Sequence, residues 1–135
     1  MGSVLDALAR LEQAESSGAL EAVCRRNRVD LLVLFGSSLT STTPGDVDVA
    51  VAFEHGFGTN LLQFIDELAD LVPGDHLDVM PLDSAGPVAG QRALTQCRVL
   101  FATTPRAFFD RQTFFINHYI DTQPMRDALL ESLRA

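Results

Sequence analysis

Two stretches decide the fold of this chain: residues 29–37, with the sequence VDLLVLFGS, and residues 46–53, with the sequence DVDVAVAF. Each is a nearly continuous apolar run of strand length, which is typical of a strand that is buried on both faces. Residues 38–45 between them are polar and rich in turn formers, so they predict a short connection. The two runs therefore predict two buried strands that lie close together in the chain.

Two carboxylates mark the start of the second run. Asp46 and Asp48 are two residues apart, so on a strand both side chains leave the same face. Neighbouring carboxylates repel one another unless a proton or a cation lies between them. This face therefore predicts a divalent metal, and an acidic, solvent-facing strand start is the alternative reading. Gly36 and Ser37, which end the first run, offer backbone N–H groups and a hydroxyl that suit phosphates.

The order of these elements resembles the nucleotidyltransferase superfamily typified by DNA polymerase beta, and especially its minimal nucleotidyltransferase (MNT) members. The shared pattern is an apolar run ending in Gly-Ser, a short loop, Asp-x-Asp and a third carboxylate on a later strand, and it extends over residues 29–104. The third carboxylate is expected in residues 75–82, DHLDVMPL, where Asp78 is the first candidate and Asp75 its rival.

The resemblance implies roles for six residues. Asp46, Asp48 and Asp78 would be catalytic and would hold two Mg²⁺ ions. The phosphates of a nucleoside triphosphate, ATP, would be bound by Gly36, Ser37 and Ser38. It also implies an α/β (α+β) fold, in which a small mixed sheet is flanked by helices, and a single nucleotidyltransferase domain over residues 1–135.

Small stand-alone proteins of this kind usually occur beside a HEPN-domain toxin. The resemblance therefore implies an antitoxin that transfers AMP from ATP to a hydroxyl acceptor, a tyrosine of the partner toxin. Two alternatives stay open. The connection 38–45 is shorter than is usual in the family and has no arginine, so the chain could be a degenerate module that neutralises its partner by contact. The other alternative is transfer to a small molecule of the aminoglycoside kind.

Most of the sequence before and after these two strands predicts helices. Apolar spacing predicts helices near the N-terminus and over 19–26, and a third helix that Thr59 or Asn60 caps. Residues 84–90 are expected to form a loop, followed by a short helix over 91–96 and a fourth strand over 98–103. Pro105 is expected to start a helix that reaches about Tyr119, with a last amphipathic helix after it.

The composition restricts the kinds of partner and the location that are expected. The net charge is −8 and all ten basic residues are arginines, which argues against direct nucleic-acid binding. No apolar stretch approaches the ~18 residues that a membrane-spanning helix needs. The first residues show neither the basic region nor the cleavage site of a secretion signal, so secretion is not expected. Cys24 and Cys97 lack metal-ligand spacing and are expected to be reduced in a cytoplasmic protein. Assembly into a homo-oligomer stays open.

Overall fold

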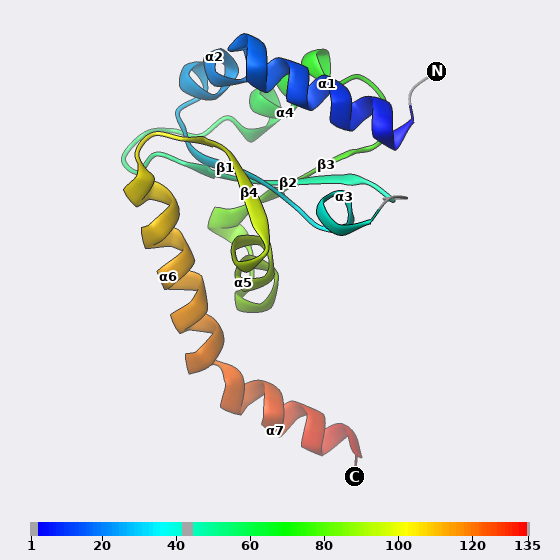
Figure 1. The fold of residues 1–135 in the computed structure, drawn as a ribbon. Helices are drawn as coiled ribbons and strands as arrows, with labels where there is room; N and C mark the ends of the chain where they lie inside the picture. The colour runs from blue at the N-terminus through cyan, green and yellow to red at the C-terminus, as the bar shows by residue number, and fades with distance from the viewer. Residues whose placement is uncertain (1–2, 42–44, 135) are drawn as a thin grey trace.

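In the computed structural model of the protein, residues 3–41 and 45–134 are described (Figure 1). These residues form four strands and eight helical segments. In order they are α1 (Val4–Ser17), α2 (Ala19–Arg26), β1 (Val29–Phe35), α3 (Ser37–Thr40), β2 (Val47–Phe53), α4 (Leu61–Leu71), β3 (Leu77–Pro81), the 3₁₀ turn η1 (Leu82–Ser84), α5 (Pro87–Thr95), β4 (Cys97–Ala102), α6 (Pro105–Asp121) and α7 (Gln123–Arg134).

The strands form one mixed sheet in the order β3-β2-β1-β4. β1 lies between β2 and β4 and is antiparallel to both. β3 pairs with the outer edge of β2 and is parallel to it, which is possible because α4 carries the chain back across the sheet. The prediction of a small mixed sheet flanked by helices is therefore confirmed.

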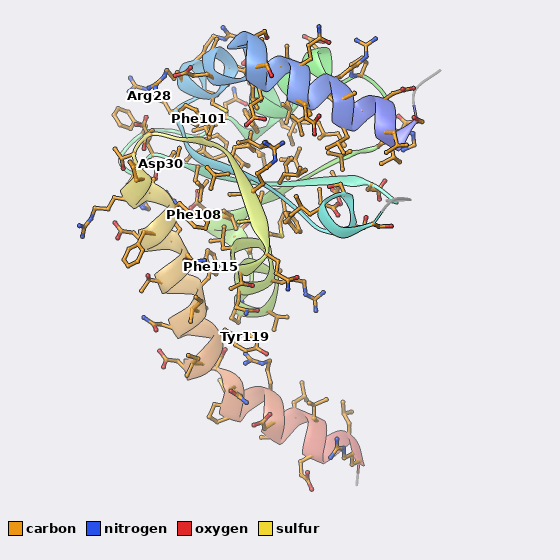
Figure 2. All side chains as sticks on the ribbon, viewed as in Figure 1. Arg28, Asp30, Phe101, Phe108, Phe115 and Tyr119 are labelled. Carbon is orange, nitrogen blue, oxygen red and sulfur yellow. The ribbon has the colours of Figure 1, made fainter. Side chains whose placement is uncertain are left out.

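Helices cover both faces of the sheet, and Figure 1 shows α1, α2 and α4 on one side with α5 on the other. On the first side, Leu32 and Leu34 of β1 pack with Leu11 of α1 and Phe64 of α4. On the second side, Leu31 and Val33 pack with residues of α5 and α6, among them Leu94 and Phe115, and Figure 2 shows Phe115 on the side of α6 that faces α5. Because both faces are buried, the central strands are apolar almost without alternation, which is the pattern that the sequence displays.

Local signals set several helix boundaries. Ser3 and Asp6 form a capping box at the start of α1, in which each side chain accepts a hydrogen bond from the other residue's backbone N–H. Asn60 caps α4, since its side-chain oxygen accepts a hydrogen bond from the backbone N–H of Gln63 at 3.0 Å. Thr104 caps α6 in the same way, with Ala107 as the donor. Asn60 is one of the two caps expected for this helix, and the cap of α6 by Thr104 was not predicted; both residue types favour helix starts.

The prediction of a loop over residues 84–90 is wrong. η1 ends at Ser84 and α5 already begins at Pro87, so residues 87–90 are helical. Proline is well suited to the first turn of a helix. Gly90 favours a loop in the sequence, because glycine is unfavourable inside helices. Its small size serves the packing of α6 instead: a Cβ on Gly90 would collide with the ring of Phe115.

Three smaller boundaries also differ from expectation. β2 begins at Val47, so Asp46 lies just before the strand and not within it. β3 spans Leu77–Pro81, which is shorter than the predicted 75–82 because the chain turns into η1. The connection 38–45 contains the last residues of the one-turn helix α3, and residues 42–44 of it lie outside the described part.

The C-terminal helices extend away from the sheet (Figure 1). α6 packs against α5 and the sheet through Ala107 and Phe115, whereas α7 buries no residue. Within residues 3–41 and 45–134, no helix is long and apolar enough to cross a membrane.

Candidate active site

The carboxylates of two neighbouring strands meet at one edge of the sheet. Asp48 on β2 and Asp78 on β3 are register partners in the parallel ladder. Neighbouring strands lie about 4.8 Å apart, and partners in register point to the same face. Asp48 is half-buried and Asp78 is exposed, so the pair lies at the boundary between the core and solvent.

Asp46 completes an acidic group at this edge. Burial raises the pKa of Asp48, and the negative charges of Asp78 and Asp46 raise it further. The cause is physical: ionising Asp48 removes a charge from water and places it beside two like charges. A cation at this position would reverse that penalty. The rival carboxylate, Asp75, lies in the turn before β3 and is not among the charges that raise the pKa of Asp48.

Gly36 brings the end of β1 against this group. Its φ of 84° lies in the left-handed region, which favours glycine because no Cβ is present. A Cβ on Gly36 would also collide with Oδ2 of Asp48. Glycine at this position therefore lets the Gly-Ser turn approach the Asp48 carboxylate, as a site that joins phosphates to a metal requires.

The two serines after Gly36 differ in their surroundings. The hydroxyl of Ser37 accepts a hydrogen bond from the backbone N–H of Gly45 at 3.2 Å, which ties the two ends of the connection together. The hydroxyl oxygen of Ser38 is buried and has no hydrogen-bond partner within the described residues. A buried polar atom without a partner is uncommon, so the Ser38 hydroxyl is the one of the two that retains its full hydrogen-bonding capacity among the described residues.

The three aspartates do not form a finished metal cage. Among the described residues, no group of three or more His, Cys, Asp or Glu side chains is arranged to hold a metal ion. The chemistry of the donors nevertheless suits Mg²⁺, which is commonly bound by one or two carboxylates, with waters and substrate phosphates as its other ligands. The group thus fits a metal that arrives with a triphosphate better than a permanently bound one.

Sequence reasoning missed a polar network at the other end of the sheet. Arg111 of α6 forms ion pairs with Asp30 at 3.1 Å and Asp83 at 3.2 Å, and it donates a hydrogen bond to the carbonyl of Phe53. Asp30 also accepts a hydrogen bond from the hydroxyl of Thr103. The network ties α6 to the ends of β1 and β2 that lie opposite Gly36 and Asp48. Its residues are far apart in the sequence, so no local motif indicates it.

Comparison with known proteins identifies a family for the chain. The family described as "Polymerase beta, Nucleotidyltransferase" matches residues 19–106. No curated protein matches the chain.

Solved structures share the fold. A toxin–antitoxin crystal structure with AMP-PNP superposes with a TM-score of 0.69 at 24% identity, covering 90% of this chain and 98% of that one. The structure of a tri-AMPylated Shewanella oneidensis HEPN toxin in complex with an MNT antitoxin gives a TM-score of 0.69 at 23% identity, covering 93% and 99%. An MntA–HepT toxin–antitoxin structure gives 0.68 at 23% identity, covering 92% and 99%.

Proposed function

The chain belongs to the polymerase beta nucleotidyltransferase family, and from this premise we propose that it is a magnesium-dependent enzyme that transfers AMP from ATP to a hydroxyl group of a partner protein. The observation that carries the proposal is the register of Asp48 and Asp78 on adjacent parallel strands, with Asp46 close by. The proximity of these three carboxylates supports the proposal, because together they offer the oxygen ligands that Mg²⁺ prefers. We further propose that residues 1–135 act as a single nucleotidyltransferase domain.

The nucleotide would bind at the end of β1. Gly36 lets the end of β1 lie against the Asp48 carboxylate, where phosphates that accompany the metal would arrive, and the Ser38 hydroxyl lacks a partner among the described residues. Ser37 would act mainly through its backbone, since its hydroxyl holds Gly45. A toxin–antitoxin structure with the same fold contains AMP-PNP, which supports ATP as the donor.

Two Mg²⁺ ions would be held by Asp46, Asp48 and Asp78. When bound, they would offset the charge of the triphosphate and favour ionisation of the attacking hydroxyl. Asp48 lies innermost of the three and is the half-buried one, so its charge would benefit most from a bound cation. Asp78 lies at the exposed side, where an acceptor can approach.

The reaction would be an in-line displacement at the α-phosphorus of ATP. The acceptor oxygen forms a bond to phosphorus, the bond between the α-phosphorus and the bridging oxygen breaks, and pyrophosphate leaves with that electron pair. The carboxylate of Asp78 takes the proton of the acceptor hydroxyl. Residues of this chain thus position the nucleotide and accept one proton, while the acceptor comes from another molecule.

The acceptor we propose is a tyrosine of a HEPN-type toxin. Neighbours in fold were crystallised with such toxins, and one of those toxins is tri-AMPylated. The location would be the cytoplasm, where ATP is available. Family membership supports transfer chemistry over a module that neutralises its partner by contact alone. It does not separate a protein acceptor from a small molecule such as an aminoglycoside.

Two measurements test the proposal. Calorimetry should detect ATP binding that depends on Mg²⁺ and is lost in the Asp46→Asn/Asp48→Asn variant. Intact-mass analysis of a co-expressed HEPN toxin should then show added AMP with the wild type and none with the variant.

If the variant protected cells as well as the wild type did, neutralisation would occur by contact and transfer would be rejected. Modification of an aminoglycoside but not of the toxin would favour the small-molecule alternative.

A further inference from the structure

The chain contains one tyrosine, Tyr119, which lies in the last turn of α6, just before the junction with α7. Figure 2 shows it at the end of α6 that is remote from the sheet. Its hydroxyl forms no hydrogen bond with a described residue, and it is not among the buried oxygens that lack a partner. The hydroxyl therefore reaches solvent, although the side chain as a whole is half-buried.

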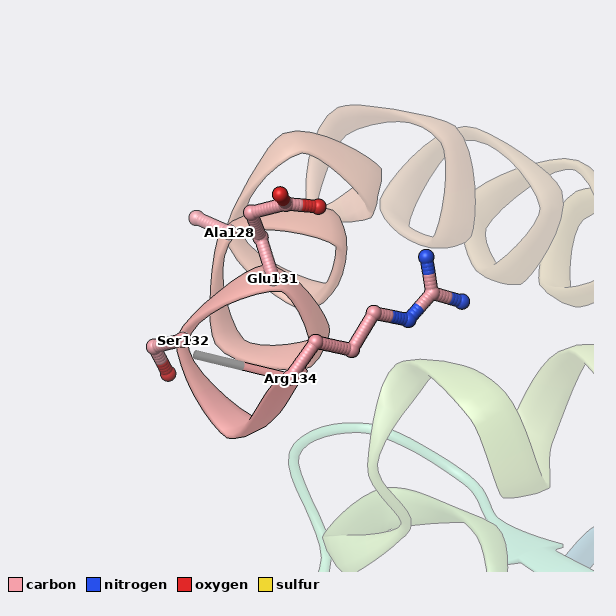
Figure 3. Close-up of a pocket in the computed structure, with 4 residues that line it drawn as sticks. All are labelled: Ala128, Glu131, Ser132 and Arg134. Atoms are coloured by element: carbon pink, nitrogen blue, oxygen red, sulfur yellow. The ribbon is translucent and has the colours of Figure 1, made fainter.

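The helix that follows Tyr119 is left uncovered by the rest of the described chain. Figure 1 shows α7 continuing from the end of α6, away from the sheet, and α7 buries no residue. The hollow near its end is lined by residues of α7 alone, namely Ala128, Glu131, Ser132 and Arg134 (Figure 3). Tyr119 thus lies at the base of an open helix, where a second molecule can approach it.

An arginine covers one face of the tyrosine ring. The guanidinium carbon of Arg126 lies 4.0 Å from the ring centroid of Tyr119. Arg126 is held there because it donates hydrogen bonds to the Tyr119 carbonyl at 2.7 Å and to the Thr122 hydroxyl at 2.6 Å. Arg126 forms no ion pair with any described residue, including Asp121 and Asp127, which are near it in the sequence. Its remaining N–H groups can therefore bind an anion beside the ring.

We propose that Tyr119 is itself an acceptor of AMP, and that the active site of a second copy of this chain modifies it. This inference rests on the proposed function, in which the acceptor is a tyrosine hydroxyl. The Tyr119 hydroxyl oxygen forms a bond to the α-phosphorus of ATP, the bond between that phosphorus and the bridging oxygen breaks, and pyrophosphate leaves with the electron pair. The phenol proton passes to the Asp78 carboxylate of the second copy.

The charges around the two groups favour this transfer. The active-site edge carries Asp46, Asp48 and Asp78, so it attracts an acceptor that brings a positive group. Arg126 brings such a group within 4.0 Å of the Tyr119 ring. After transfer, the phosphodiester on Tyr119 carries a negative charge, which the same guanidinium can bind. One arginine thus favours both the approach of the acceptor and the modified product.

The second copy supplies the active site because Tyr119 lies far from the active site of its own chain. The Arg111 network holds α6 to the ends of β1 and β2 that lie opposite Gly36 and Asp48. Tyr119 follows Pro105, the first residue of α6, by fourteen residues, or about 21 Å along the helix at 1.5 Å per residue. Figure 1 shows α6 leading away from the sheet over this length. The tyrosine hydroxyl and the carboxylates of one chain are therefore held apart.

Intact-mass analysis of the purified chain with ATP and Mg²⁺, in the absence of a toxin, tests this inference. The wild type should gain the mass of one AMP, and Tyr119→Phe should gain none. Arg126→Gln should be modified about tenfold more slowly, because it loses a charged hydrogen-bond donor beside the acceptor. Arg106→Gln is the matched control, since Arg106 is 82% exposed in the first turn of the same helix, and it should be modified at the wild-type rate.

A mixture of two variants tests whether transfer occurs between copies. Asp48→Asn keeps Tyr119 but should lack activity, and Tyr119→Phe keeps the active site but lacks the acceptor. The Asp48→Asn chain should gain AMP in the mixture and should gain none alone. If the wild type is modified and the Asp48→Asn chain in the mixture is not, transfer occurs within one chain and the inference is overturned.

A HEPN toxin added to the same reaction separates this inference from the proposed function. Tyr119→Phe should modify the toxin as the wild type does. A modified toxin beside an unmodified wild-type chain would overturn the inference and leave the proposed function standing. Absence of AMP from both proteins would reject both. AMP that persists on Tyr119→Phe would place the modification on another residue and would also overturn the inference.

Discussion

The carboxylate of Asp48 lies against Gly36, in the space that a side chain at residue 36 would occupy. β1 and β2 meet here as an antiparallel pair in which Phe35 faces Asp48. The backbone of Gly36 has a φ of 84°, so the chain turns away from the sheet directly beside the carboxylate. This contact joins the two halves of the motif, Gly-Ser and Asp-x-Asp, which are separate in the sequence.

Replacing Gly36 with alanine should therefore damage both stability and nucleotide binding. The new methyl group meets Oδ2 of Asp48 and stands on a left-handed backbone, a combination that costs about 1–3 kcal/mol. We expect urea denaturation to detect this loss and calorimetry to detect weaker binding of ATP with Mg²⁺.

Gly45 supplies the matched control for this substitution. It lies at the other end of the same connection, and a Cβ there would meet no atom of the described residues within 4 Å. Gly45→Ala should change stability by no more than about 0.5 kcal/mol and should leave ATP binding intact. Equal losses in both variants would mean that the whole connection is sensitive, and that the contact between Gly36 and Asp48 has no special role.

Arg111→Ala should be among the most destabilising substitutions outside the core. The Arg111 side chain is 12% exposed and its removal leaves Asp30, itself only 20% exposed, without its cationic partner. Removing one member of a buried pair costs about 3–5 kcal/mol, and partial exposure of the aspartates places the expected loss near the lower figure. Urea denaturation measures it.

Arg106→Ala on the same helix controls for the loss of an arginine. Arg106 is 82% exposed and pairs with Asp110 at 3.6 Å, so its removal should cost less than about 1 kcal/mol. If the two variants unfolded at the same urea concentration, the Arg111 network would not hold α6 to the sheet.

The sequence allowed the sheet and the family to be predicted because the deciding residues are close together. Strands that are buried on both faces leave apolar runs, and Gly-Ser and Asp-x-Asp stand at their ends. The choice between Asp75 and Asp78 needed the structure, since it depends on the register that β3 adopts beside β2 after the crossover through α4. The role of Asp46, Asp48 and Asp78 in holding metal stays a prediction.

Two other features could not be predicted from the sequence, because the residues that contact each other are far apart in the chain. Gly90 suggests a loop until the ring of Phe115 is seen against it. Arg111 belongs to a helix whose sequence gives no sign that its partners come from β1 and η1. In both examples the residue is explained by a tertiary contact that its neighbours in the sequence do not indicate.

Glu67 should make stability depend on pH in the acid range. Hydrogen bonds from Asn27 and Arg26 lower the pKa of Glu67 below its usual value of 4.5. A carboxyl group with a lowered folded-state pKa stabilises the fold above its unfolded-state pKa, and this stabilisation is lost as pH falls through the folded-state pKa. Glu67→Gln should therefore lower Tm at pH 7, and its difference from the wild type should shrink below about pH 4.

Asp66→Asn removes the same charge from the neighbouring position of α4. Asp66 is exposed and has no hydrogen bond or ion pair with another described residue. Its substitution should leave Tm unchanged at both pH values. A loss of Tm equal to that of Glu67→Gln would assign the effect to net charge and not to the bonds with Asn27 and Arg26.

Asp48→Asn should stabilise the metal-free protein while it removes the proposed activity. The pKa of Asp48 is raised by burial and by the charges of Asp78 and Asp46. A raised pKa means that the folded state holds the proton more tightly than the unfolded chain, so stability declines as pH rises through the folded-state value. Asparagine is neutral at every pH and avoids this penalty. In EDTA, the variant should therefore have a higher Tm than the wild type at pH 8, and the difference should vanish at pH 3.

Mg²⁺ with ATP should reverse this order. Ligands that bind only the folded state raise its stability, so the wild type should gain Tm and Asp48→Asn should not. Asp75→Asn is the control, since it removes an exposed carboxylate from the turn before β3 and should gain Tm as the wild type does. If Asp48→Asn were less stable than the wild type in EDTA, Asp48 would have a partner that compensates its charge, and the argument that this edge of the sheet requires a cation would fail.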